Sequence, residues 1–303
     1  MQKQFEISPD KVKPYLDHPE RMTTFMDFKV DFAFKYILGH KRILLKLIND
    51  ILPVKVSDIE YLSNEIPVIS EKEKRATFDV ICTARDTGEK ILAEMQCLPD
   101  SDMDDRLLFY GCSLIHRQIE RGDKAYLLKP VYVLCIADYL RPHSPEVPSD
   151  RFYFGYQFRE ETHPGDKFTD NLQFFFLELP RLQKIWDSLE TNTERWCYIF
   201  GNLDKFANVP QNPAGFEDVF QVAETGELNE NEFNQYVSSM VTEYDKRVIG
   251  EYFHREGYEK GKAEGKAEGM AEGKAEERAS LLAAFRAAGV SEEMIAAALA
   301  AVK

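Results

Sequence analysis

Two short stretches of the chain, TFDVI at residues 77–81 and LAEMQC at residues 92–97, decide how the sequence is interpreted. Apolar and polar residues alternate in both, which predicts two β-strands at 77–84 and 90–98. The five residues between them include a glycine and are few enough for a hairpin. Successive strand side chains point to opposite faces, so Glu94 and Gln96 share one face of the predicted hairpin.

The length of the hairpin loop determines which residues lie opposite one another. A two-residue loop at Thr87-Gly88 places Asp79 opposite Gln96 and diagonal to Glu94, so that two carboxylates converge on one face. A one-residue bulge in the turn would change this register, and the predicted geometry depends on its absence.

Two converging carboxylates are costly unless a cation lies between them or one of them is protonated. Hard oxygen ligands of this kind suit Mg²⁺ or Mn²⁺, and such an ion can activate water for attack on a phosphodiester. The alternative is a polar, solvent-facing side of an antiparallel sheet, which alternation alone also predicts. The spacing of the acidic residues along the two strands does not decide between a metal site and a solvent-facing side of the sheet.

The flanking sequence predicts helices and strands around this hairpin. A helix over 27–51 is broken near Gly39 and ends before Pro53. The order of elements predicts an α/β or α+β domain in which helices pack on a sheet. The other expected strands are 56–62, 131–137, 152–158 and 172–179, and the other expected helices are 104–121, 181–200 and a segment from 229 onward.

The two ends of the chain differ in kind from the middle. Three prolines in residues 1–20 indicate an irregular lead-in. Residues 21–200 form the predicted core domain and 201–256 a helical segment. Glycine recurs every four residues from Gly257 to Gly273, so residues 257–279 form either a solvated helical spacer or a close helix–helix contact. The pattern of residues 280–303 predicts a small helical hairpin. Its apolar side chains need a partner to be buried, which makes a homo-oligomer possible.

Composition limits the choice of function without selecting one. The chain of 303 residues carries 52 acidic and 38 basic side chains, and almost all of the acidic excess lies after residue 135. A global charge of this sign neither requires nor excludes a DNA partner for one groove. No run of about 18 apolar residues and no signal-peptide pattern is present, which predicts a cytoplasmic protein with no membrane association.

An ordered set of motifs resembles a known family over residues 22–180. It consists of DFAFK (31–35), LINDIL (47–52), Arg75 with Asp79-Val80, Asp86 with Gly88, EMQ (94–96), Arg106 with Tyr110, Gly122 with Tyr126 and KPV (129–131), and NLQFFFLEL (171–179). This set resembles the Rpn-type recombination-promoting nucleases, which are also described as transposases of the PD-(D/E)XK nuclease superfamily. A glycine-repeat tail with a helical hairpin is similar to the tails of these proteins.

The resemblance implies a restriction-endonuclease-like core, with a mixed sheet flanked by helices and a C-terminal helical extension. It also implies cleavage of DNA with Mg²⁺, for which Mn²⁺ can substitute. By position, Asp79 and Glu94 match the acidic metal ligands. Gln96 stands where many relatives have the lysine that assists the nucleophilic water, and a glutamine cannot carry that positive charge.

Other residues receive supporting roles from the same resemblance. Asp31 matches an outer acidic residue near the metal. Lys35, four residues later on the same helix face, would pair with Asp31, contact phosphate, or partly replace the missing lysine. An ordinary ion pair between the two is the structural alternative. Phosphate contacts are expected from Lys29, Lys41, Arg42, Arg75, Arg106 and Tyr110, for which a surface role is the alternative.

The sequence therefore predicts a metal-dependent DNA endonuclease linked to recombination or mobile DNA. A protein of another class also fits, namely a non-catalytic nuclease-like scaffold that oligomerises through its C-terminal helices. Metal-dependent cutting separates these two hypotheses.

Overall fold

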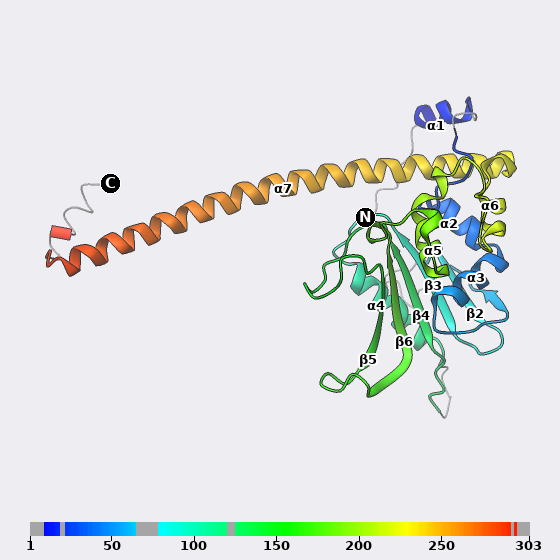
Figure 1. Ribbon diagram of the computed structural model, residues 1–303, viewed down its shortest axis with the longest axis horizontal. Coiled ribbons are helices and arrows are strands. Elements are labelled where there is room, and N and C mark those ends of the chain that lie inside the picture. Colours follow the sequence, from blue (N-terminus) through cyan, green and yellow to red (C-terminus); the bar gives the residue numbers. More distant parts are fainter. Residues whose placement is uncertain (1–8, 19–21, 65–77, 120–124, 292–293, 296–303) are drawn as a thin grey trace, which may run out of the picture. The chain divides into compact units, whose positions relative to one another are not determined.

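The computed structural model describes residues 9–18, 22–64, 78–119, 125–291 and 294–295 (Figure 1). The chain divides into two compact units, Met1–Arg247 and Val248–Lys303, which are treated separately below. Helix α7 (Glu230–Ala287) begins in the first unit and continues into the second.

A six-stranded mixed sheet forms the centre of the first unit, in the order β1-β2-β3-β4-β6-β5. Strand β4 pairs in parallel with β3 and β6, and the remaining neighbours are antiparallel. Every residue of β4 is buried, as expected for a strand covered on both faces. The strands are β1 (Ile59–Tyr61), β2 (Val80–Ala84), β3 (Lys90–Gln96), β4 (Val131–Ala137), β5 (Tyr153–Arg159) and β6 (Lys167–Glu178).

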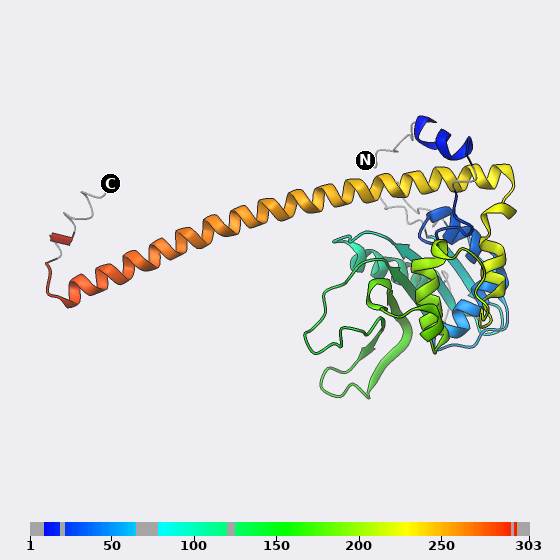
Figure 2. The same ribbon diagram turned by 45° about the horizontal axis from the view of Figure 1, so that its top comes forward.

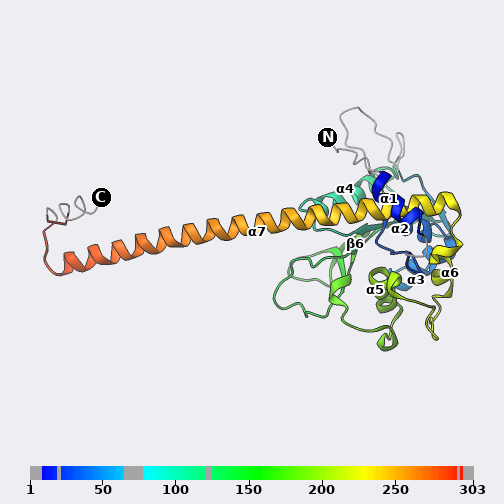
Figure 3. The same cartoon turned by 90° about the horizontal axis from the view of Figure 1, so that it is seen from above.

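Helices cover both faces of this sheet, which confirms the predicted mixed sheet flanked by helices. Alternate residues of β3 enter two different cores: Ile91 and Ala93 face one, and Leu92 faces the other. Figure 3 shows α4 and α5 on opposite sides of the sheet, and Figure 2 shows the same helices from an intermediate angle. The helices of the first unit that precede α7 are α1 (Pro9–Leu16), α2 (Asp31–Leu38), α3 (Lys41–Ile51), α4 (Met103–His116), α5 (Asn192–Asn202) and α6 (Glu217–Ala223).

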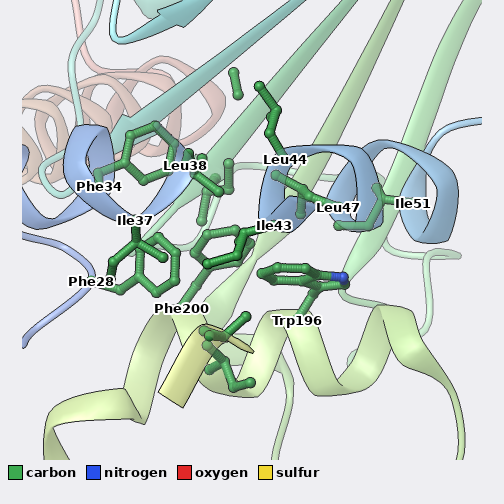
Figure 4. Close-up of a cluster of buried hydrophobic side chains, with 14 of the residues drawn as sticks. Phe28, Phe34, Ile37, Leu38, Ile43, Leu44, Leu47, Ile51, Trp196 and Phe200 are labelled. Carbon is green, nitrogen blue, oxygen red and sulfur yellow. The ribbon is translucent and has the colours of Figure 1, made fainter. Parts of the chain in front are cut away.

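The larger core lies between α2, α3, α5 and the sheet (Figure 4). Phe28 packs edge-on against Phe200 with the ring centres 4.7 Å apart, and Trp196 packs against Phe216 at 4.9 Å. These side chains are fully buried, and burial of each large aromatic group contributes about 1.5–3 kcal/mol. Residues before β1 and after β6 therefore build one core, and they hold α2 in place over the sheet.

Two adjacent polar residues at the end of α3 tie this core together. The side-chain amide of Asn49 donates to the carbonyl of Val56 and accepts from its N–H, both at 2.8 Å. The carboxylate of Asp50 accepts from Trp196 Nε1 at 2.9 Å and from Asn192 Nδ2 at 2.8 Å. The first contact orients the chain toward β1, and the second joins α3 to the start of α5.

Two segments differ from the sequence-based expectation. Residues 9–16, expected to be irregular, form α1, because Pro9 occupies the first helical position, where a missing N–H costs nothing. The helix expected over 181–200 begins only at Asn192. Thr191 and Glu194 form a capping box that fixes the start of α5 there. By contrast, the expected break near Gly39 is confirmed, since α2 ends at Leu38 and α3 begins at Lys41.

The second unit contains the glycine repeat, which is helical throughout its length. A Cβ added at Gly265, Gly269 or Gly273 would meet nothing within 4 Å, so no residue of the described part of the chain packs against these three positions. Gly289 adopts a positive φ of 78° just after α7 ends, as expected for a helix-terminating glycine. Within the described residues, no helix combines the length and apolar character that crossing a membrane requires.

Replacing Asp50 by alanine is expected to destabilise the first unit by about 2–3 kcal/mol, because the buried Trp196 Nε1–H loses its acceptor. Urea unfolding followed by tryptophan fluorescence measures this change, since both tryptophans of the chain, Trp186 and Trp196, lie in this unit. Asp50→Asn keeps a side-chain oxygen at this position and should lose less stability than Asp50→Ala. Equal losses in the two variants would contradict this role for Asp50.

Candidate active site

The hairpin of β2 and β3 has a four-residue connection, Arg85–Gly88, rather than the expected two-residue loop. Strand pairing runs from Val80 opposite Ala93 to Thr83 opposite Lys90. Gly88 closes the turn with a φ of 89° and donates its N–H to the carbonyl of Ala84 at 2.9 Å. Continued by one residue, this register places Asp79 opposite Glu94, so the predicted pairing of Asp79 with Gln96 is wrong by two residues. A shift of two preserves the face of every side chain, and the two carboxylates still converge.

Asp79 and Glu94 are held by reciprocal bonds between side chain and backbone. The N–H of Asp79 donates to Glu94 Oε1 at 3.2 Å. The N–H of Met95 donates to Asp79 Oδ2 at 2.9 Å. Glu94 is only 6% exposed, so its carboxylate is removed from bulk water. The two acidic groups therefore have defined positions at the carboxyl end of β3.

Burial makes both carboxyl groups weaker acids than usual, and a neighbouring negative charge adds to this effect at each of them. Burial raises the pKa of Asp79, although the N–H of Met95 and the charge of Lys35 act in the opposite direction. Burial, followed by the charge of Asp79, raises the pKa of Glu94 well above its usual range. Two negative charges on this pair are therefore unfavourable, and a bound cation would offset that cost.

Helix α2 brings a third carboxylate and an ammonium group to this pair. Lys35 Nζ lies 2.6 Å from Asp31 Oδ1 and 3.6 Å from Asp79 Oδ1. Burial lowers the pKa of Lys35, but its hydrogen bond to Asp31 and the charges of Asp31, Asp79 and Glu94 outweigh this effect and raise it. Lys35 is therefore a charged ammonium group. The expected ion pair with Asp31 is present, and Lys35 also contacts the carboxylate pair.

The side chain of Gln96 is already used within the protein. Its Oε1 accepts from Arg106 Nη2 at 2.8 Å, and its Nε2 donates to the carbonyl of Leu98 at 2.9 Å. Arg106 Nη1 donates to Asp100 Oδ2 at 3.0 Å, while its buried Nε has no hydrogen-bond partner among the described residues. The guanidinium charge of Arg106 is among the influences that lower the pKa of Glu94. Gln96 thus holds an arginine beside the carboxylates.

Tyr110 packs one helical turn beyond Arg106, on the same face of α4. It is 8% exposed and meets the ring of Phe78 edge-on at 4.8 Å. Burial, with a contribution from Glu94, raises the pKa of Tyr110, so its hydroxyl stays protonated.

The remaining predicted basic residues are paired with acidic groups or lie outside the described residues. Lys41 pairs with Asp58, and Arg42 Nη1 lies 3.7 Å from Asp218 Oδ2. Both line a separate cavity of about 550 Å³ between the start of α3 and α6. Lys29 Nζ pairs with Asp138 at 3.4 Å. Arg75 lies outside the described residues.

Some residues near the site have no counterpart in the sequence-based prediction. Asp100 pairs with Arg106 in the structure. In the sequence it is one of several acidic residues at the start of a predicted helix, and nothing there indicates this pairing. Four residues of α7 (Asn234, Gln235, Ser238 and Ser239) share a cavity with Asp31 and Lys35. About 200 residues of sequence separate the two sides, and no local pattern signals such a contact.

The donor set suits one hard divalent ion. Among the described residues, no group of three or more His, Cys, Asp or Glu side chains is arranged to hold a metal. Mg²⁺ does not need such a cage, because it is commonly bound through one or two carboxylates together with water and substrate phosphate. Asp79 and Glu94 could provide these two carboxylates, since burial and the charge of Asp79 raise the pKa of Glu94 and a cation would offset both effects.

Comparison with known proteins is consistent with this geometry. No curated protein and no solved structure matches the chain. Residues 28–252, about three quarters of the chain, match the family described as PD-(D/E)XK nuclease family transposase. The matched range includes the mixed sheet, the carboxylate pair and the start of α7. The chain therefore belongs to the PD-(D/E)XK nuclease family transposases.

Proposed function

We propose that this protein is a metal-dependent endonuclease that hydrolyses phosphodiester bonds of DNA. The buried pair of Asp79 and Glu94, with its raised pKa values and an adjacent ammonium group, carries this proposal. Such a pair is costly to fold and becomes favourable when a divalent cation binds. Membership of a nuclease family supports DNA as the substrate.

In the proposed reaction Asp79 and Glu94 would hold Mg²⁺, for which Mn²⁺ could substitute. The bound ion supplies Lewis acidity and an activated water. One P–O ester bond breaks, the hydroxyl of water joins phosphorus, and the hydrogen of water ends on the leaving oxygen. Lys35 contributes positive charge 3.6 Å from Asp79, where the attacked phosphate would lie, while Asp31 keeps this ammonium group in place.

We assign Gln96 to holding Arg106 rather than to orienting water. Both polar atoms of its amide already bond to the protein. The guanidinium group of Arg106 can donate to phosphate oxygens, a role for which its planar donor array is suited. In this assignment Lys35 and Arg106 together provide the positive charge that the absent lysine would have supplied.

The other proposed contacts follow from the same function. Lys41, Arg42 and Arg75 are proposed to contact the DNA backbone. Lys41 and Arg42 would exchange their exposed ion pairs for phosphates, at little cost. A role in recombination or mobile DNA and oligomerisation through the C-terminal helices are part of the same proposal.

Asp79→Asn and Glu94→Gln are each expected to lower nicking of supercoiled plasmid more than about 100-fold, a larger loss than that of a residue outside the metal ligands. The assay compares Mg²⁺, Mn²⁺ and EDTA. Asp17→Asn, at an exposed carboxylate on the N-terminal segment, is the control and should retain full activity. Absence of cutting by the folded native protein in either metal would favour the scaffold hypothesis, to which the engaged amide of Gln96 also lends support.

Metal binding is expected to strengthen as pH rises through the raised pKa values of Asp79 and Glu94, because both groups must lose their protons to bind the ion.

The same pKa shifts also affect the stability of the folded protein. A carboxyl group with a raised pKa in the folded state favours folding at low pH, and this contribution is lost as pH rises from the unfolded pKa to the folded pKa. Without metal at neutral pH, Glu94→Gln should therefore unfold at a higher temperature than the native protein.

Calorimetry without metal, at acidic and at neutral pH, measures this difference. The advantage of Glu94→Gln should shrink at acidic pH, where the native Glu94 is itself protonated. Lower stability of Glu94→Gln at neutral pH would show that burial and repulsion of the Glu94 charge do not dominate its effect on stability.

Gln96→Lys is expected to reduce cleavage at least about 10-fold, because an ammonium group would face the guanidinium group of Arg106 and displace it. If Gln96 merely replaced a catalytic lysine, Gln96→Lys would instead raise the cleavage rate. Gln96→Met and Arg106→Gln should each lose activity, and the double variant should lose no more than Arg106→Gln alone, since the two act as one unit. Steady-state kinetics on a plasmid substrate measures all four variants.

A further inference from the structure

A cavity of about 700 Å³ lies directly beside the proposed catalytic centre. One wall is α2 and the other is the first part of α7. Lys35, which lies 3.6 Å from Asp79, and its ion-pair partner Asp31 also line this cavity. The remaining lining residues are Phe32 and Tyr36 of α2 and Asn234, Gln235, Ser238 and Ser239 of α7.

Hydrogen bonds hold the two walls in a fixed relation. The N–H of Phe32 donates to Ser239 Oγ at 3.2 Å, and the N–H of Asp27 donates to the hydroxyl of Tyr236 at 2.8 Å. Asn229 and Glu232 bond reciprocally, side chain to backbone, at 3.0 Å, which fixes the start of α7. The cavity is therefore formed before any ligand enters, as is usual for small-molecule sites.

The electrostatics of the lining favour a neutral ligand. Its two charged members, Asp31 and Lys35, form an ion pair with each other at 2.6 Å. The α7 wall presents two amides and two hydroxyls, which donate and accept hydrogen bonds without net charge. Burial and the charge of Glu232 raise the pKa of Tyr36, so its hydroxyl also remains neutral. A phosphate group would find no unpaired cation among these lining residues.

The α2 wall offers an aromatic surface. The rings of Phe32 and Tyr36 are nearly parallel, with an interplanar angle of 17° and centres 5.4 Å apart. A flat ligand with hydrogen-bonding edges can contact this wall and reach the amides across the cavity. Among the parts of a DNA strand, only the base is flat, neutral and edged with donors and acceptors.

We propose that this cavity is a nucleobase subsite that receives one unstacked base next to the phosphate that is cut. The base packs on Tyr36 and bonds to Asn234 or Gln235. A base reaches such a cavity only after leaving its stack, which costs least where it is mismatched or single-stranded. The proposal rests on the proposed nuclease function and names its preferred substrate as DNA with an unpaired base beside the cleavage position.

The experiment uses the full-length protein with Mg²⁺ and a duplex oligonucleotide whose cleavage position has been mapped. Abasic residues are placed singly at each position around the cut. One position should slow cleavage by roughly 5–100-fold, as expected from loss of one base–aromatic contact. Tyr36→Ala and Asn234→Ala should slow cleavage of the intact duplex and should have little further effect on that one abasic duplex.

Tyr244→Ala is the matched control, since Tyr244 is an exposed tyrosine of α7 in the same unit that does not line the cavity. It should behave as the native protein on every duplex. A Tyr36→Ala effect of equal size on the intact and all abasic duplexes would overturn the proposal. Asn234 is exposed, so Asn234→Ala tests the cavity without disturbing the packing of Tyr36.

A protein that cuts nothing would refute the nuclease function, and the subsite is then tested by binding alone. A fluorescent purine analogue at an unpaired position reports stacking through quenching. Quenching by the native protein that is lost in Tyr36→Ala and kept in Tyr244→Ala would support the subsite. No quenching by the native protein, or equal quenching by both variants, would overturn it.

Discussion

A four-residue loop sets the register of β2 against β3, and the geometry of the proposed active site depends on that register. Because Ala84 and Gly88 close the loop, Asp79 comes to lie opposite Glu94, where each residue accepts a hydrogen bond from the backbone beside the other. A loop longer or shorter by one residue would turn one member of the pair to the opposite face of the sheet. The pair, the ammonium group beside it and the anchored arginine all require this one alignment.

Helix α2 connects the separate parts of the site. Its buried side chains, among them Phe34 and Ile37, pack into the larger core, which fixes the position of the helix. Asp31 and Lys35, four residues apart, project toward the carboxylate pair, and Phe32 and Tyr36, also four apart, form the aromatic wall of the adjacent cavity. The eight residues of α2 thus contribute to the core, to the charges of the proposed active site and to the proposed base subsite.

The sequence contains enough information to predict the hairpin, the shared face of the acidic residues and the mixed sheet with flanking helices. It does not specify whether the loop has two residues or four, since this depends on the positive φ of Gly88 and its packing beside Lys129. It also does not reveal that Gln96 bonds to Arg106, because nine residues and a change from strand to helix lie between them. The sequence also does not reveal that residues of α7 form one wall of the cavity. Their position depends on packing around Tyr236, which contacts residues about 200 positions earlier in the chain.

The repulsion within the carboxylate pair has an evolutionary consequence. A chain released from selection for cleavage would gain stability from a neutral side chain at position 94 that still accepts the N–H of Asp79, such as glutamine, because Glu94 is buried against Asp79. Mutation would then remove one of the two acids early, well before the apolar core changed. Retention of both acids in a lineage of such chains would therefore record continuing selection for their chemistry, and their loss would date its end.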